Sequence, residues 1–134
     1  MAEVSRPAHS EMVALPLPFA DARGAIQPLL EGGFASAQLI SSVAGSVRAN
    51  RYHKEDWHYC YMVSGVMNYY WREVGSGAEP TCIRVTAGDM IFTPAMEEHA
   101  MQFLEDSVFI NFANRQRDQA SDEEDLVRVK LIDA

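Results

Sequence analysis

Hydrophobic and polar residues alternate along this chain in short runs, and turn residues interrupt the runs about every eight to twelve positions. Alternation with a period of two is typical of strands, because successive side chains point to opposite faces of a sheet. No segment shows helical periodicity over three turns. Many short strands separated by turns predict an all-β sandwich or barrel. The predicted strands are 12–17, 35–42, 47–53, 58–64, 66–73, 80–86, 90–93, 98–104, 107–112 and 126–131.

The length of the chain, 134 residues, suits one domain with a single hydrophobic core. Residues 1–11 are polar and aperiodic, so we expect a flexible lead-in there, with His9 exposed and without a role, and one domain over 12–134. No apolar run approaches the roughly 20 residues of a membrane helix, and the N-terminus lacks the layout of a signal peptide. Cys60 and Cys82 are too few for a disulfide framework, so we expect a cytoplasmic protein with reduced thiols.

The net charge of the chain and the exposed edges of its predicted sheets limit the partners that it can bind. The net charge of −8 argues against a nucleic-acid groove, which needs a basic face to release counterions. A local basic pocket can still bind an anion, so phosphate-bearing ligands stay open, whereas the acidic cluster 122–125 is interpreted as a solvated loop. Exposed strand edges favour pairing with a second copy. We therefore expect a homodimer, with the residues before 45 and the tail strand 126–131 at the seam.

Three of the four histidines lie on predicted strands at positions that face one barrel interior. His53 ends one strand, His58 begins the next after a short turn, and His99 arrives from a distant hairpin. Converging imidazoles suit zinc, iron, nickel, copper or manganese, so these three residues form a candidate site for a divalent transition metal. No organic cofactor is expected. Cys60 shares the face of His58, and we favour a small core residue over a soft metal ligand there.

Arg51 faces the same interior as His53 and leaves two alternatives open. A guanidinium stays protonated and cannot bind a metal, but three histidines could still hold one with open positions for water or substrate. Alternatively, the positive charge repels a dication, and a metal-free site uses His53 or His58 as general base while Arg51 binds an anion or a polarised carbonyl. Arg51 is therefore both a catalytic and a substrate-binding candidate. The other candidate substrate-binding residues share the inward face and are Met62, Met101 and Phe103.

Two segments resemble the motifs of the cupin family. Residues 45–65 are similar to the first motif: a glycine, five residues, H-x-H, three or four residues, an acid, and a glycine six residues on. Residues 88–99 are similar to the second motif, whose matching positions are Gly88, Pro94 and His99. Arg51 replaces the first histidine and His58 replaces the acid. The departures in the second motif are Met96 for a glycine and Phe103 for an asparagine. The resemblance implies a cupin jelly-roll β-barrel, also called a double-stranded β-helix.

Three further segments resemble the nucleotide-linked sugar 3,4-ketoisomerases and, more distantly, the deoxysugar 3,5-epimerases. Residues 21–26 are similar to the D-x-R-G-x-L opening of the ketoisomerases, residues 48–54 to their R-G-G-H-A-H-K run, and residues 124–129 to their closing D-Y-I-R. That family does not rely on a bound metal, and its run supplies an acid/base pair of histidines beside a ketone. The resemblance implies that His53 is the base and that Arg51 occupies the position of its partner. The run is also similar to R-A-N-H-Y-H-K in small metal-binding cupins.

Three functions follow as expectations, in this order. The first is isomerase or epimerase chemistry, by proton transfer, on a ketosugar nucleotide or a related small polar substrate. The second is a metal-dependent oxygenase or lyase that acts on a small molecule. The third is a barrel without enzymatic activity that binds a metabolite. Metal content separates the first two functions, and substrate turnover separates both from the third.

Overall fold

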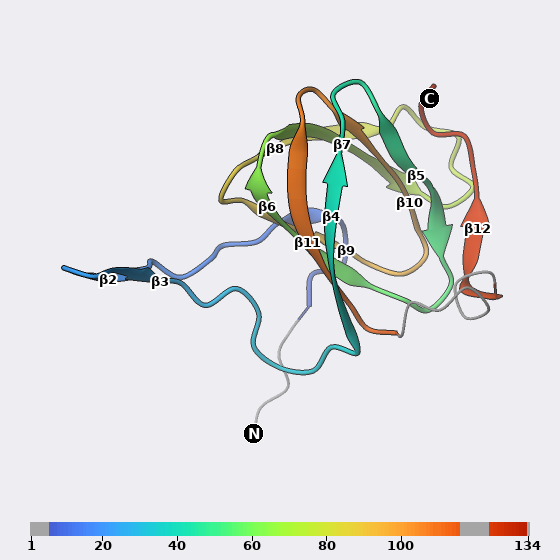
Figure 1. Cartoon of the computed structure of the whole chain (residues 1–134). Coiled ribbons are helices and arrows are strands. Elements are labelled where there is room, and N and C mark those ends of the chain that lie inside the picture. The colour runs from blue at the N-terminus through green and yellow to red at the C-terminus, as the bar shows by residue number, and fades with distance from the viewer. Residues whose placement is uncertain (1–5, 116–123, 134) are drawn as a thin grey trace.

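A computed structural model describes residues 6–115 and 124–133 of the chain, and the described part is built from β-strands in two five-stranded sheets and one two-stranded ribbon (Figure 1). The all-β prediction is therefore confirmed. No helix in this part of the chain is long and apolar enough to cross a membrane. The strands are β1 Glu11–Met12, β2 Phe19–Asp21, β3 Gly24–Ile26, β4 Ser36–Ser42, β5 Val47–His53, β6 His58–Ser64, β7 Val66–Glu73, β8 Thr81–Thr86, β9 Met90–Thr93, β10 Glu97–Phe103, β11 Ser107–Ala113 and β12 Leu126–Arg128.

The two large sheets are antiparallel and interleave distant parts of the sequence. The first has the order β1-β9-β6-β11-β4, and the second has the order β12-β5-β10-β7-β8. Consecutive strands β5 and β6 therefore belong to different sheets, as do β10 and β11. Strands that are adjacent in the sequence therefore lie on opposite walls of one barrel. In this way His53 and His99, on β5 and β10, come to face His58 on β6.

Side chains of alternate positions from both sheets fill the barrel. The buried core cluster consists of Cys60, Met62, Met67, Tyr69, Val85, Ile91, Met101, Phe103 and Phe109. The tight turn between β6 and β7 needs Gly65, whose φ is 94° and where an added Cβ would overlap with the side chain of Ser107. Met101 and Phe109 of this cluster also line a cavity in the barrel.

The N-terminal segment is attached to the outside of the first sheet. Glu11 pairs with Phe92 of β9, and the Val13 amide donates a hydrogen bond to the Met90 carbonyl at 2.8 Å. A second apolar cluster forms beneath this segment on the face of β6 that points away from His58. Its buried members are Tyr59, Met90 and Phe92. The chain itself thus covers the outer face of the first sheet at β9 and at the start of β6.

His9 is exposed, as expected, but its side chain has a defined partner. Its Nδ1 lies 2.9 Å from Oε2 of buried Glu97, and its ring stacks on Trp71 at 5.5 Å. The backbone amide of Ser10 donates to the other oxygen of Glu97 at 2.7 Å, and the Ser10 hydroxyl lies 2.7 Å from that of Tyr69. The described part of the lead-in therefore hydrogen bonds to the barrel; its flexibility stays a prediction.

The ribbon β2–β3 is the element that the hydrophobic pattern does not predict. A strand was expected at 12–17, but the segment after β1 has no strand until Phe19. The ribbon closes through a local turn in which the Asp21 carboxylate accepts hydrogen bonds from the backbone amide of Arg23 at 2.9 Å and from its guanidinium at 2.7 Å. All residues of both strands are exposed, so no buried face marks them in the sequence.

Candidate active site in the barrel

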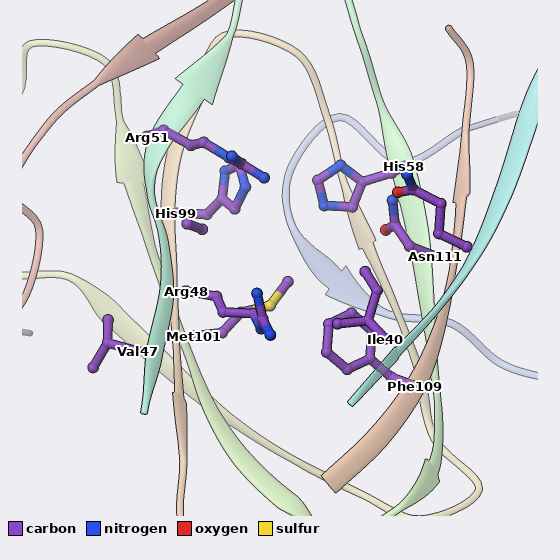
Figure 2. Close-up of a pocket in the computed structure, with 11 residues that line it drawn as sticks. Ile40, Val47, Arg48, Arg51, His58, His99, Met101, Phe109 and Asn111 are labelled. Carbon is purple, nitrogen blue, oxygen red and sulfur yellow. The ribbon is translucent and has the colours of Figure 1, made fainter. Parts of the chain in front are cut away.

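A cavity of about 250 Å³ opens between the two sheets (Figure 2). Its polar wall combines two guanidinium groups, two imidazoles and two amides, which belong to Arg48, Arg51, His58, His99, Gln38 and Asn111. Its apolar wall includes Ile40, Met101 and Phe109. Polar groups that converge in a concave pocket beside an apolar wall can orient a small polar molecule.

An irregularity in β5 brings both arginines into this cavity. Residues three apart in a regular strand face opposite sides of a sheet, so Arg48 and Arg51 would not share a wall. The register between β5 and β10 shifts between His99 and its neighbour, and two consecutive residues of β5, Ala49 and Asn50, have φ values of 70° and 53°. A bulge of this kind re-aims the side chains that follow it. Arg48 therefore belongs to the site, although strand parity alone assigns it to the other face.

The three predicted histidines come together at one end of this cavity. His53 ends β5, His58 begins β6 and His99 lies within β10, and their relative exposures are 1%, 3% and 0%. The ring centroids of His53 and His58 are 6.0 Å apart, those of His53 and His99 6.1 Å, and those of His58 and His99 5.3 Å. His58 and His99 line the cavity from opposite sheets, and His53 lies beside both.

Asp125 holds the ring of His53. Its carboxylate oxygen lies 2.9 Å from His53 Nδ1, and the carboxylate also accepts hydrogen bonds from the backbone amides of Glu55 at 2.8 Å and Asp56 at 3.3 Å. Burial by itself raises the pKa of the Asp125 carboxyl, but these hydrogen bonds outweigh it and hold the pKa below its ordinary value. An ionised carboxylate only accepts, so Nδ1 of His53 carries a hydrogen, and in the neutral ring Nε2 carries the lone pair.

The interpretation of the acidic cluster 122–125 as a solvated loop is wrong for Asp125, whereas residues 122 and 123 lie outside the described part of the chain. Asp125 is 4% exposed and belongs to the site, whereas Glu124 is exposed. Strand β12 starts at the next residue and pairs with β5, with Leu126 opposite His53. This pairing brings Asp125 into contact with His53, although the two residues are 72 positions apart in the sequence. The resemblance of 124–129 to a ketoisomerase tail was the signal in the sequence that could have found it.

His99 is held in a similar way by its own strand and by a neighbouring ring. Its Nδ1 lies 3.2 Å from the backbone carbonyl oxygen of Glu97, which only accepts, so Nδ1 carries the hydrogen here as well. The ring of Tyr69 stacks on it with centroids 6.2 Å apart. The Tyr69 hydroxyl is in turn fixed between Ser10 at 2.7 Å and Thr93 at 2.6 Å. The N-terminal segment thus supports the site through Tyr69.

The remaining predicted site residues lie at different depths. Met101 lines the cavity, and its role in substrate binding stays a prediction. Met62 and Phe103 are fully buried in the core cluster below it and are not part of the cavity wall. Cys60 lies in the same core cluster, where burial raises the pKa of its thiol, in agreement with a core role. Ile40 and Phe109 occupy the part of the apolar wall that was predicted to hold Met62 and Phe103.

The hydrogen bonds that His53 and His99 make through Nδ1 are typical of histidines that bind a transition metal. The distances among the ligand atoms of the three histidines do not fit a shared metal. Metal-binding histidines usually donate their second ring nitrogen to a carboxylate or a carbonyl, as His53 and His99 do. Within the described ranges, however, the group of three whose candidate ligand atoms all lie within 4.8 Å of one another is His53, Asp56 and Asp125. In that group, Nδ1 of His53 carries a hydrogen bonded to Asp125. The metal assignment to His53, His58 and His99 stays a prediction.

Comparison with known proteins identifies the fold. No family model and no curated protein matches the sequence. Among solved structures, QdtA, a sugar 3,4-ketoisomerase from Thermoanaerobacterium thermosaccharolyticum in complex with TDP, matches with a TM-score of 0.74 and 14% identity over 92% of this chain and 90% of its own. A variant of QdtA was solved with TDP-4-keto-6-deoxyglucose. A 3,4-ketoisomerase from Helicobacter canadensis matches with a TM-score of 0.74 and 14% identity over 89% and 90%.

An epimerase shares the fold as well. ChmJ, a 3'-monoepimerase from Streptomyces bikiniensis in complex with dTDP-quinovose, matches with a TM-score of 0.67 and 17% identity over 83% of this chain and 65% of its own. At such low identities the likeness shows the fold alone. The chain has the cupin jelly roll of these sugar-nucleotide ketoisomerases and epimerases, as the motifs predicted.

Proposed function

We propose that the protein is an isomerase or epimerase that transfers a proton at the carbon beside a ketone of a nucleotide-linked sugar. The observation that carries the proposal is the buried pair of His53 and Asp125, 2.9 Å apart, next to two further imidazoles and two guanidinium groups. Such a set supplies a base, candidate acids and positive charge in one small cavity. The fold, shared with ketoisomerases and an epimerase of sugar nucleotides, supports the same chemistry.

His53 is the base in this proposal. Because Asp125 keeps the hydrogen on Nδ1, Nε2 carries the lone pair that accepts the proton from carbon. The ring becomes positively charged as it accepts this proton, and the ionised carboxylate at 2.9 Å stabilises that charge in a buried setting. The base therefore needs no metal to be effective.

The other polar groups complete the reaction. Removal of the proton moves negative charge onto the ketone oxygen and gives an enediol or its anion, which a guanidinium stabilises. Arg51 lies directly opposite His99 in the strand register, so it is the candidate for this role. An isomerisation then moves the proton of the neighbouring hydroxyl to the former ketone oxygen and adds a proton to the former carbonyl carbon, so that the hydroxyl oxygen becomes the new ketone oxygen. His58 and His99 line the cavity and are the candidates for these two transfers.

Deuterium exchange with TDP-4-keto-6-deoxyglucose tests this chemistry. In D₂O the wild-type protein is expected to exchange the hydrogen next to the ketone, with or without a shift of the ketone, both visible by proton NMR. His53→Asn removes the base and is expected to lower the exchange rate by at least about 100-fold. His9→Asn is the matched control, since its half-exposed side chain lies outside the cavity. Equal exchange by the wild-type and His53→Asn proteins would reject the proposal.

A metal-dependent oxygenase or lyase is the second candidate, and the outer hydrogen bonds of His53 and His99 are the observation that favours it. Metal analysis of the purified protein tests it. If the three histidines bind a metal, His53→Ala, His58→Ala and His99→Ala each remove most of it, because a three-ligand site has none to spare. Arg51→His would add a fourth imidazole and raise metal affinity while it weakens the proposed isomerase. Metal-free protein with exchange activity excludes this candidate.

A further inference from the structure

Asn111 lies on a strand face that is otherwise apolar. Strand β11 runs between β6 and β4, and the register places Asn111 opposite Cys60 on one side and Gln38 on the other. Directly opposed residues of an antiparallel pair project from the same face, as do residues two apart in one strand. Asn111 therefore shares its face with Phe109 and Ala113 as well. Cys60, Phe109 and Ala113 are buried, so Gln38 is the polar neighbour of Asn111 in this arrangement.

The carboxamide of Asn111 makes no hydrogen bond to the part of the chain that the structure describes, although its residue is only 6% exposed. A buried amide without a partner costs free energy, and asparagine is depleted in strands. Asn50 is the contrast. Its side chain donates to the Ile132 carbonyl at 3.0 Å and accepts from the backbone amides of Leu131 and Ile132, each at 3.1 Å. The side chain of Asn50 thus holds the fold together, and among the described residues that of Asn111 does not.

The Asn111 side chain faces the barrel cavity instead. Figure 2 shows it on the same wall as His58, with Arg48 and Arg51 on the opposite wall. Gln38 is half-buried and lines the cavity from the neighbouring strand, directly opposite Asn111 in the register. The first sheet thus presents two neighbouring carboxamides to a space that the second sheet supplies with two guanidinium groups.

These two carboxamides carry the side-chain oxygen atoms of the cavity wall, as far as the described residues form it. The guanidinium groups of Arg48 and Arg51 only donate hydrogen bonds, whereas a carboxamide both donates and accepts. A hydroxyl group of a bound molecule also does both, because its proton needs an acceptor and its oxygen can accept from an N–H. A carboxylate or a phosphate only accepts and would leave the amide oxygens without a donor. The wall around Asn111 therefore suits a neutral, hydroxyl-bearing part of a ligand.

We infer that Asn111 is a specificity-determining residue which, together with Gln38, hydrogen bonds to a hydroxyl group of the molecule in the barrel cavity. The ligand supplies the partner that the fold does not, so a molecule without this hydroxyl leaves a buried amide unpaired and binds more weakly. Asn111 thus exchanges stability of the free protein for selectivity. That the molecule is a nucleotide-linked ketosugar rests on the proposed function; the recognition of a hydroxyl by Asn111 does not.

Thermal unfolding of the free protein tests the first half of this exchange. Asn111→Leu and Asn111→Val replace the amide with apolar groups of similar or smaller size and remove no hydrogen bond of the described fold, so at least one of them is expected to have a Tm equal to or above that of the wild-type protein. Asn50→Leu is the comparison, and its Tm is expected to fall by several degrees because three hydrogen bonds are lost. If both Asn111 variants lose as much as Asn50→Leu, the amide stabilises the fold and the inference is overturned.

Calorimetric titration tests the second half, with TDP-4-keto-6-deoxyglucose and TDP as probes in a His53→Asn background that blocks turnover. Asn111→Leu is expected to weaken binding of the sugar nucleotide about tenfold and to leave the affinity for TDP, which lacks the sugar, unchanged. Asn111→Thr keeps a hydroxyl that donates and accepts, and it is expected to recover part of the loss. Asn68→Leu on β7 is the matched control, because Asn68 is half-buried and lies outside the cavity.

The outcomes separate this inference from the proposed function. An equal loss for TDP and the sugar nucleotide, or no loss for either, overturns the role of Asn111. If the protein binds neither nucleotide, saturation-transfer NMR with free 6-deoxyglucose decides: a signal that Asn111→Leu abolishes supports the inference, and its absence from the wild-type protein overturns it. If sugar binding depends on Asn111 but the hydrogen next to the ketone is not exchanged, the inference stands and the proposed function fails. With both intact, Asn111→Leu changes KM more than kcat.

Discussion

The strand β10 and the ribbon β2–β3 are both antiparallel β-structure, yet they bury very different parts of their surface. In β10 every residue except Gln102 is buried, while in β2 and β3 every residue is exposed. Strand β10 pairs with β5 on one side and with β7 on the other, and its inward face packs within the barrel. The ribbon pairs with nothing else in the described part of the chain and projects away from the barrel (Figure 1).

We expect the two elements to have different roles: β10 positions residues of the site, and the ribbon provides a surface for association. Register with two neighbours determines where each side chain of β10 points, which is the condition for placing His99 within a site. An isolated two-stranded ribbon is only marginally stable in water, and this one exposes Phe19 at 68%, Ile26 at 71% and the adjacent Leu17 at 91%. Apolar side chains arranged in this way suit a contact with a second copy of the chain.

The largest expected effect is at Asp125. Asp125→Asn keeps the shape of the side chain but offers a donor as well as an acceptor to His53, so the ring can reverse its tautomer and lose the basic Nε2. By analogy with other histidine–aspartate pairs, we expect kcat with TDP-4-keto-6-deoxyglucose to fall by about 10³–10⁴. Unchanged circular dichroism is the control for folding. A fall of less than about tenfold would show that Asp125 does not act through the base.

The next effect contrasts two phenylalanines. Phe103→Ala in the core is expected to lower the free energy of unfolding by about 3–5 kcal/mol, because it leaves a cavity beneath the site. Phe19→Ala on the ribbon is expected to change it by no more than about 0.5 kcal/mol at concentrations where the protein is monomeric. Urea unfolding measures both. Comparable losses in the two variants would mean that the ribbon packs against the chain's own barrel.

The ribbon is expected to act in association instead. Phe19→Ser combined with Ile26→Ser removes the apolar side chains that we expect at the seam of a homodimer. Sedimentation at micromolar concentration is expected to give twice the chain mass of 15.0 kDa for the wild-type protein and a shift towards the monomer for the double variant. Val63→Ser, at an exposed apolar residue of β6 outside the expected seam, is a control for general loss of surface hydrophobicity. A wild-type mass near that of one chain would refute the dimer.

The smallest effect concerns the attachment of the N-terminal segment. The hydrogen bond and the charge of Glu97 raise the pKa of His9. A raised folded pKa means that this contact stabilises the protein fully below the unfolded value of about 6.5 and that the contribution is lost as the pH rises through the folded pKa. The difference in Tm between the wild-type protein and His9→Asn is therefore expected to be largest near pH 5.5 and to shrink by pH 9. An equal difference at both pH values would contradict the linkage.

Much of the barrel was predictable because strand periodicity is a local property. The predicted strands 47–53, 58–64, 66–73 and 90–93 have the bounds that the structure shows for β5, β6, β7 and β9. The ribbon was missed because neither of its faces is buried, so no alternation of hydrophobic and polar residues marks it. The predicted tail strand 126–131 ends at Arg128, since the chain then turns to bond Asn50.

The sequence by itself determined the inward direction of His53, His58 and His99, because alternation within each strand depends only on local backbone geometry. Only the tertiary structure decided that Arg48 faces the same cavity. The bulge at 49–50 forms where β5 pairs with β10, and the pairing of two distant strands is not a local property of the sequence. It also decided that Asp125 is the partner of His53. That contact joins residues 72 positions apart through the pairing of β12 with β5, and no local pattern in the sequence encodes a pairing of that range.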